Sequence, residues 1–180
     1  IEKGGFKHFM LKEIHEQPAA IRETLTGRIN LETGDVHLEE LNLTPESIRR
    51  FARVHLVACG TSWHACLVGK RYIEQLALLP CDVDYGSEYR YRHPLADELT
   101  LTISVSQSGE TADTLAAMEE SASKGAVVVS ICNVRGSAMT RRSHGVVYTH
   151  AGPEIGVAST KAFTTQLAAL YLLALHFGRV

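Results

Sequence analysis

Short apolar strand patterns alternate with amphipathic helix patterns along most of this sequence, and this alternation constrains its fold more than any other feature. Strands are predicted over 54–59, 81–85, 99–106, 126–131 and 145–149, and helices over 61–79, 112–124 and 159–177. Each crossover helix must pack back onto the sheet, so this order predicts parallel strands covered on both faces. We therefore predict an α/β fold, a three-layer αβα sandwich whose five-stranded parallel sheet has the order 2-1-3-4-5.

The third predicted strand fits this scheme only in part. Its apolar residues Leu99, Leu101, Ile103 and Val105 alternate with threonines and serines. Such alternation is typical of a strand with one exposed face. Small hydroxyl groups can be buried when each has a hydrogen-bond partner, so we keep the strand in the parallel sheet.

The first 44 residues are predicted to form an arm outside the α/β domain. Residues 6–25 have a helical pattern interrupted at Pro18, which can open a second short helix. Residues 26–44 are expected to be irregular or a small hairpin that turns at Gly34-Asp35. Because the chain starts at Ile1 and stops shortly after an apolar helix, we expect a piece of a longer protein, with an arm over 1–44 and a domain over 45–180.

Composition excludes several classes of function. Eighteen Lys and Arg against twenty Asp and Glu give a net charge of −2, which argues against nucleic-acid binding. The longest apolar run, 167–175, is far shorter than the roughly 20 residues that a membrane span needs. The cysteines, none at C-x-x-C spacing, are expected to be buried free thiols in a reducing cytoplasm: Cys59, Cys66, Cys81 and Cys132. No metal site is predicted, because the scattered histidines lack a second ligand at metal-binding spacing.

Two strand-to-helix turns contain the parts of a phosphate cradle. One is Cys59-Gly-Thr-Ser62, with Thr61 and Ser62 as hydroxyl donors; the other is Ser106-Gln-Ser-Gly-Glu-Thr111. Free N–H groups and the helix dipole favour an anion at such a turn, and glycine lets the backbone approach it. In the order 2-1-3-4-5, strands one and three meet at the topological switch point, so both turns would line one crevice. The alternative is that these hydroxyls are ordinary helix caps. Glu110 fits a phosphate site only if its carboxylate points away or binds the sugar.

Other motifs give weaker signals. No G-x-G-x-x-G follows the first strand, although Asp82 or Asp84 lies where a ribose-binding acid would fall, which leaves a nucleotide-binding enzyme as an alternative. The serines of the second turn are not in a G-x-S-x-G elbow. The segment 152–161 opens the last helix with Ser159 or Thr160 as the cap. There Lys161 could be a reactive amine, a phosphate partner or a solvated first-turn residue.

Three segments resemble a known family. Cys59-Gly-Thr-Ser62, Ser106-Gln-Ser-Gly-Glu-Thr-Ala-Asp-Thr114 and Glu154-Ile-Gly-Val-Ala-Ser-Thr-Lys-Ala162 are similar to the sugar isomerase (SIS) domain of the glucosamine-6-phosphate synthases, the isomerizing glutamine–fructose-6-phosphate aminotransferases. His8-Phe-Met-Leu-Lys-Glu-Ile14 in the arm matches this family too, so the resemblance covers nearly the whole chain. It implies the SIS fold, of flavodoxin-like order, in the first SIS domain of such an enzyme.

The resemblance also implies a ligand and its contacts. These enzymes convert fructose 6-phosphate and glutamine into glucosamine 6-phosphate in the cytoplasm, and their isomerase half is usually dimeric. By the family pattern the sugar phosphate is contacted by eight residues: Thr61, Ser62, Ser106, Gln107, Ser108, Thr111, Val157 and Ser159. No cofactor is expected.

The same resemblance implies what is absent. The family's glutaminase domain precedes the arm, and its isomerase acid/base residues belong to the second SIS domain, so no residue of this chain is expected to be catalytic. Two other hypotheses stay open: a phosphosugar-sensing SIS module without catalysis, and a domain that serves mainly as a dimerisation scaffold.

Overall fold

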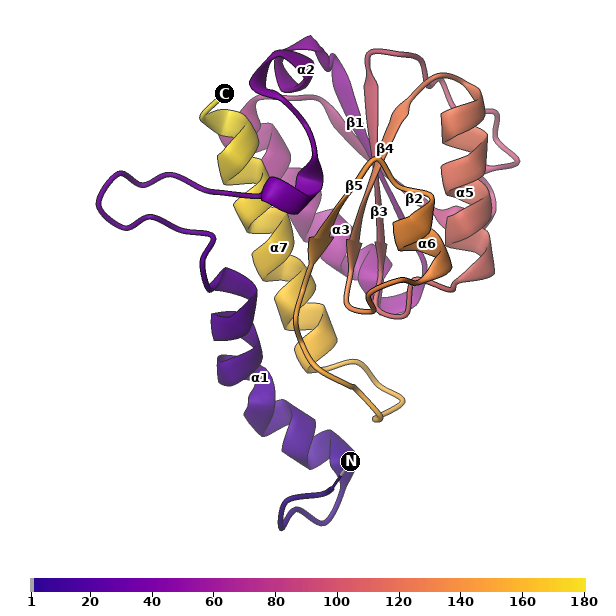
Figure 1. Cartoon of the computed structure of the whole chain (residues 1–180). Helices are drawn as coiled ribbons and strands as arrows, with labels where there is room; N and C mark the ends of the chain where they lie inside the picture. Colours follow the sequence, from indigo (N-terminus) through magenta and orange to yellow (C-terminus); the bar gives the residue numbers. More distant parts are fainter. Residues whose placement is uncertain (1) are drawn as a thin grey trace.

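The computed structural model describes residues 2–180, and at its centre five parallel strands form one sheet (Figure 1). The elements in chain order are α1 (Phe9–Leu25), η1 (Glu39–Leu41), α2 (Pro45–Arg50), β1 (Arg53–Ala58), α3 (Gly60–Tyr72), η2 (Ile73–Ala77), β2 (Cys81–Tyr85), α4 (Gly86–Tyr89), β3 (Thr100–Ser106), α5 (Ala112–Ser123), β4 (Val127–Cys132), α6 (Ala138–Arg141), β5 (Gly145–Tyr148) and α7 (Lys161–Gly178). The strand order is β2-β1-β3-β4-β5 and every neighbouring pair is parallel. The predicted fold class and strand order are therefore confirmed.

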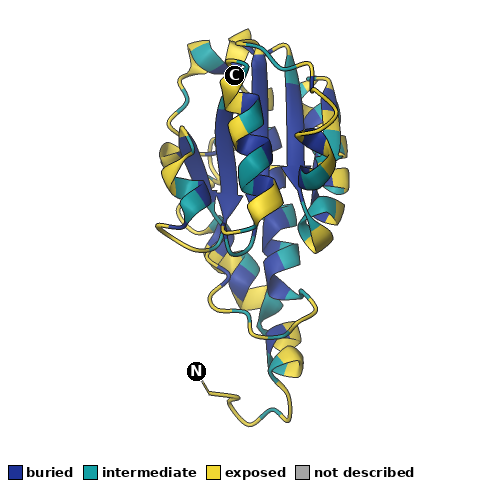
Figure 2. Ribbon diagram, turned by 90° about the vertical axis from the view of Figure 1, so that its right-hand side faces the viewer, coloured by how far each residue is buried: buried dark blue, intermediate teal, exposed yellow. Residues whose placement is uncertain are grey.

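Two helical layers enclose the sheet because its strands are apolar on both faces. Side chains such as Leu56, Ile103 and Ile131 form one core with α3 and α7. On the opposite face Val128 packs with Met118 of α5 and with α6. Figure 2 shows the strands buried between exposed outer helix surfaces. Since each crossover helix covers one face, the carboxyl ends of all the strands lie at the same edge of the sheet.

Strand β3 is buried along its whole length, although its alternating sequence predicts a half-exposed strand. Its apolar side chains face α3 and α7, whereas its hydroxyl side chains face the other layer. There Thr102 Oγ1 lies 2.6 Å from Ser121 Oγ of α5, which supplies the partner that a buried hydroxyl needs. Within residues 2–180, Ser104 Oγ is buried without a partner.

The short helices α2, α4 and α6 were not predicted, and two of the predicted helices differ from expectation in their course. Helix α1 continues through Pro18 instead of breaking there. Proline has no N–H for the carbonyl four residues before it, but Gln17 Nε2 donates to the Ile14 carbonyl at 3.0 Å and replaces that bond. Helix α3 ends at Tyr72, earlier than predicted, and the chain continues as the π-turn η2 before Leu78 adopts a left-handed conformation.

The arm packs beside α7 and its helix extends beyond the sheet (Figure 1). Residues 28–37 form the predicted small hairpin, with an antiparallel bridge between Ile29 and Val36. The His37 N–H donates to the Arg28 carbonyl and the Asn30 N–H to the Asp35 carbonyl, both at 2.9 Å. The arm is anchored where Thr24 Oγ1 donates to the Thr149 carbonyl at 2.5 Å. The C-terminal end of the arm is anchored where the Leu41 backbone packs on Gly145 of β5. A side chain at position 145 would overlap the Leu41 backbone.

The four cysteines are free thiols, and all except the half-buried Cys59 are buried, in line with the prediction. Burial raises the pKa of the Cys81 thiol to about 12, so it stays protonated and unreactive. None of the helices in residues 2–180 has both the length and the apolar character to cross a membrane.

A buried polar network lies between β1 and the α4–α5 layer. His55 Nδ1 lies 2.9 Å from the Tyr89 hydroxyl, which is 3.2 Å from Ser121 Oγ. Burial lowers the pKa of His55 from its usual 6.5; the smaller influences of neighbouring charges partly offset one another, since Asp82 raises it and Arg92 lowers it. The folded protein therefore holds this ring neutral.

We predict that the free energy of unfolding falls as pH is lowered below about 6.5. In the unfolded chain His55 then binds a proton, whereas in the folded chain its lowered pKa keeps the ring neutral. The contribution of His55 is complete above that pH and is lost as pH falls towards the lowered pKa of the folded state. Urea denaturation at a series of pH values measures this dependence. It should be flatter in His55→Gln and unchanged in the control His64→Gln, whose ring is exposed on α3. Equal slopes in all three proteins would contradict the prediction.

Candidate functional site

The two hydroxyl-rich turns lie side by side because β1 and β3 are hydrogen-bonded neighbours. Ala58 at the end of β1 is paired with Val105, one residue before the end of β3. In the first turn Gly60 has a φ of +56° and opens α3 directly after Cys59. Thr61 is exposed and Ser62 is half-buried in the first turn of that helix. The N–H groups of a helix start thus lie beside the second turn.

The second turn is held in shape by its own hydroxyls. Ser106, only 4% exposed, accepts a hydrogen bond from the Gly109 N–H at 3.0 Å and lies 3.2 Å from Thr111 Oγ1. Ser108 Oγ accepts from the Glu110 N–H at 3.2 Å. Gly109 has a φ of +68°, which glycine adopts without strain. The turn is therefore preorganised, with the Ser106 and Thr111 hydroxyls beside each other.

Glu110 does not oppose an anion in these turns. Its Oε1 accepts a hydrogen bond from the Ala138 N–H at 2.8 Å, at the start of α6. This directs the carboxylate away from Ser106 and Ser108 and onto a neighbouring helix terminus, where negative charge is favourable. This contact is consistent with the first of the two conditions set by the sequence, that the carboxylate points away from a phosphate or binds the sugar.

Gln166, a residue that the sequence did not single out, orients the first turn. Its side chain is 3% exposed on α7, and Nε2 donates to Ser62 Oγ at 2.9 Å. The hydroxyl oxygen is thereby fixed as an acceptor, which leaves the Ser62 O–H free to donate elsewhere. No local pattern reveals this pair, because the two residues are 104 positions apart.

Glu154, also missed by the sequence, caps α7. The residue in the cap position is Thr160, one of the two predicted, but its side chain makes no capping bond. Instead Glu154 Oε1 accepts from the Thr160 and Ala162 N–H groups at 2.8 and 3.1 Å, and Oε2 accepts from Ser159 Oγ at 3.1 Å. A carboxylate at a helix N-terminus is stabilised by the helix dipole.

Lys161 points away from the two turns. It is 4% exposed, and its Nζ lies 2.7 Å from Glu16 Oε2 in α1. This hydrogen bond lowers the pKa of Glu16 below its usual value. Of the three interpretations of Lys161 left open by the sequence, the solvated residue is wrong, since the ammonium group is buried and paired with the arm.

The remaining segment, 152–160, forms a loop between β5 and α7. Val157 is completely exposed at its tip, and Ser159 lies near its end. A depression of about 590 Å³ reaches from Gln107 in the second turn to Glu154 in this loop. The eight predicted contact residues come from three segments, and the turns after β1 and β3 are adjacent by strand pairing. Of the eight, Gln107 alone lines this depression; the loop borders it through Gly152, Pro153 and Glu154, and not through Val157 or Ser159.

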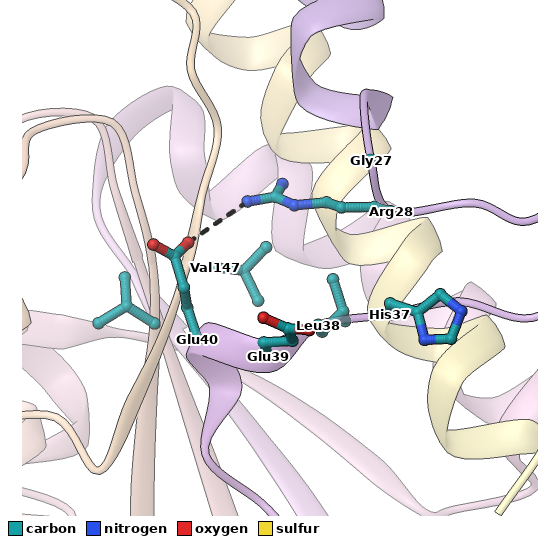
Figure 3. A pocket seen from close by; sticks show the side chains of 8 residues that line it. Gly27, Arg28, His37, Leu38, Glu39, Glu40 and Val147 are labelled. Carbon is teal, nitrogen blue, oxygen red and sulfur yellow. Dashed lines mark ion pairs between the residues drawn. The ribbon is translucent and has the colours of Figure 1, made fainter.

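A second cavity, of about 220 Å³, lies between the arm and β5 (Figure 3). Figure 3 shows Arg28 and Glu40 facing each other there, 3.8 Å apart. Arg28 is almost buried, which lowers its pKa, and it donates to the Thr24 carbonyl at 3.0 Å. The positive charge of Arg28 is thus partly neutralised by the Glu40 carboxylate and the Thr24 carbonyl. No Ser or Thr is among the residues that line this cavity.

The acids considered for ribose binding are placed on β2. Asp84 is paired with Arg92, and Asp82 is exposed beside Lys70. Within the described residues 2–180, no three His, Cys, Asp or Glu side chains are grouped so that they could hold a metal ion.

Comparison with known proteins agrees with this geometry. A family model described as the SIS domain matches residues 47–176. The chain is 58% identical, over 99% of its length, to a glutamine–fructose-6-phosphate aminotransferase [isomerizing] of Methanosarcina acetivorans, and it spans 29% of that relative. The C-terminal domain of glucosamine-fructose-6-phosphate aminotransferase from Francisella tularensis has a TM-score of 0.91 at 43% identity, covering 99% of this chain and 49% of that one. A glucosamine-6-phosphate deaminase from Thermotoga maritima, at 22% identity and TM-score 0.74 over 93% and 48% of the two chains, shares the fold.

The fold and the paired turns define a doubly wound α/β domain, a class of protein in which ligands bind where the strand order reverses. Within that class, the family model covers most of the sequence. The chain belongs to the SIS domain family, and the resemblance noted in the sequence is confirmed.

We predict that Gly109→Ala disrupts the second turn far more than the control Gly136→Ala. Both glycines have a φ near +70°, so each alanine costs about 1–2 kcal/mol in backbone strain. A Cβ at Gly109 would also overlap Ser137 and lie 2.8 Å from Cys132 Sγ, whereas nothing lies within 4 Å at Gly136. Chemical denaturation should therefore show a loss about 1–3 kcal/mol larger for Gly109→Ala. Equal losses would mean that the turn is not tightly packed.

Proposed function

We propose that this chain is the first SIS domain, with its preceding arm, of an isomerizing glutamine–fructose-6-phosphate aminotransferase, and that it binds the sugar phosphate. The observation that carries the proposal is the pair of hydroxyl-rich turns at the neighbouring ends of β1 and β3. The 58% identity to a relative of that name supports it. The ligands proposed are fructose 6-phosphate and glucosamine 6-phosphate.

In this proposal the phosphate lies between the two turns. Ser62, Ser106, Ser108 and Thr111 supply hydroxyl donors, Thr61 and Gln107 lie beside them, and backbone N–H groups at the start of α3 add further donors. Val157 and Ser159 contact the sugar from the loop 152–160. Neutral donors suit a site that must bind and release a charged ligand repeatedly.

The rest of the enzyme lies outside this chain in our proposal. Residues 1–44 connect to a glutaminase domain, residues 45–180 are the SIS domain, and a second SIS domain follows. The assembled enzyme is a cytoplasmic homodimer, and its reaction needs no cofactor.

Calorimetric titration tests the phosphate site. We expect fructose 6-phosphate and glucosamine 6-phosphate to bind, and free fructose and NAD to give no heat. Replacing Ser106 and Ser108 together by Ala should abolish binding, since each hydroxyl donor to a charged group contributes about 1.5–3 kcal/mol. Ser123→Ala, at an exposed serine at the end of α5, is the control that keeps full affinity. Unchanged affinity in the double variant would mean that these serines are only structural.

A turnover assay tests the missing catalytic groups. We expect the purified chain neither to transfer ammonia from glutamine nor to isomerise fructose 6-phosphate, because the acid/base residues belong to the second SIS domain. Product analysis by mass spectrometry after long incubation provides the measurement. Turnover at the rate of a complete enzyme of this class would show that the catalytic assignment is wrong.

A further inference from the structure

A carboxylate of the arm is buried against the loop 152–160. Glu13 lies on α1, and the residue is only 2% exposed. Its Oε1 accepts from the Ile155 N–H at 2.6 Å and from the Gly156 N–H at 3.3 Å, and its Oε2 accepts from the Gly156 N–H at 3.0 Å. A buried carboxylate is stable only when such donors replace its water, so this is a specific docking contact between the arm and the loop.

The ends of the loop are held by other groups. Asn133 Nδ2 donates to the Gly152 carbonyl at 2.7 Å, and Glu154 accepts from Ser159 and Thr160 at the start of α7. Between these two anchors, and within residues 2–180, the Glu13 carboxylate makes the hydrogen bonds to the backbone of 155–158. The middle of the loop therefore depends on the arm for its position.

The packing at this contact leaves no spare room. A Cβ added to Gly156 would lie 2.7 Å from Glu13 Oε2 and 3.5 Å from the Met10 Cα. The residue that follows, Val157, is completely exposed although it is apolar. The backbone that leads to the exposed Val157 is thus held at Ile155 and Gly156 by the Glu13 side chain.

We infer that Glu13 is a positioning residue for sugar recognition: it holds the loop 152–160 so that Val157 and Ser159 meet the sugar part of a ligand whose phosphate is bound by the turns after β1 and β3. This inference rests on the proposed function. It separates two parts of the site: the phosphate donors belong to the α/β domain, whereas the loop backbone next to Val157 is positioned by the arm, and Ser159 by Glu154.

The test is an NMR titration of the whole 180-residue chain with fructose 6-phosphate and, separately, with inorganic phosphate. In Glu13→Ala we expect the affinity for fructose 6-phosphate to fall about tenfold or more, the loss of a contact of about 1.4 kcal/mol. The affinity for inorganic phosphate, reported by the amides of 106–111, should stay unchanged. Glu13→Gln keeps one oxygen acceptor, so its affinity for fructose 6-phosphate should lie between those of the unaltered chain and Glu13→Ala.

Two further variants make the result specific. In Gly156→Ala the added Cβ would lie too close to Glu13 Oε2 and displace the loop from the carboxylate. This variant should therefore show the same selective loss of affinity for fructose 6-phosphate. Glu23→Ala, at an exposed position of the same helix, should behave like the unaltered chain. Hydrogen exchange gives an independent measurement, in which the Ile155 and Gly156 amides should lose protection in Glu13→Ala.

Each outcome decides between the hypotheses. Equal loss of both affinities in Glu13→Ala would make Glu13 a general structural residue and overturn the inference, as would unchanged affinity for fructose 6-phosphate. Equal affinity of the unaltered chain for fructose 6-phosphate and inorganic phosphate would overturn it too, since the loop would then add nothing. Binding of neither ligand by the unaltered chain would instead overturn the proposed function, and the inference with it.

Discussion

The parallel pairing of β1 with β3 is the constraint on which the rest of the structure depends. It places the central strands so that the chain reverses its direction of winding between them, and it brings two turns from distant parts of the sequence to one edge. Helices α3 and α5 begin at those turns, so their unpaired N–H groups converge at the same place. Doubly wound sheets bind their ligands at such a point, and in this chain serines and threonines supply uncharged hydrogen-bond donors there.

Three carboxylates near the two turns and the loop 152–160 form hydrogen bonds to backbone N–H groups. Glu110 caps α6, Glu154 caps α7 and Glu13 binds the loop backbone. Each is neutralised by backbone N–H groups and not by a basic side chain, and the one buried lysine near the loop is paired with Glu16. These three carboxylates are therefore satisfied by backbone donors of other segments, although Glu110 belongs to the second turn itself.

Local patterns were sufficient for much of this protein. The apolar runs predicted the strands within a residue or two, because this signal lies within a few neighbouring residues. The predicted strand order placed the turns after β1 and β3 side by side, as the structure does. The helical pattern was wrong at Pro18, where α1 continues because Gln17 supplies a donor in place of the missing N–H. The alternation in β3 was ambiguous, and the strand is buried in the parallel sheet as predicted, with Thr102 paired to Ser121.

What the sequence determined by itself was the layered α/β architecture, the strand order and the position of the hydroxyl-rich turns, since these follow from periodicity and from residue types at element ends. Only the tertiary structure decided how the side chains around the turns are used. The partners of Ser62, Lys161 and Ile155 are 104, 145 and 142 residues away. Contacts over such separations depend on how the arm and α7 pack against the sheet, and that packing arises from the summed burial of many side chains, which no short stretch of sequence encodes.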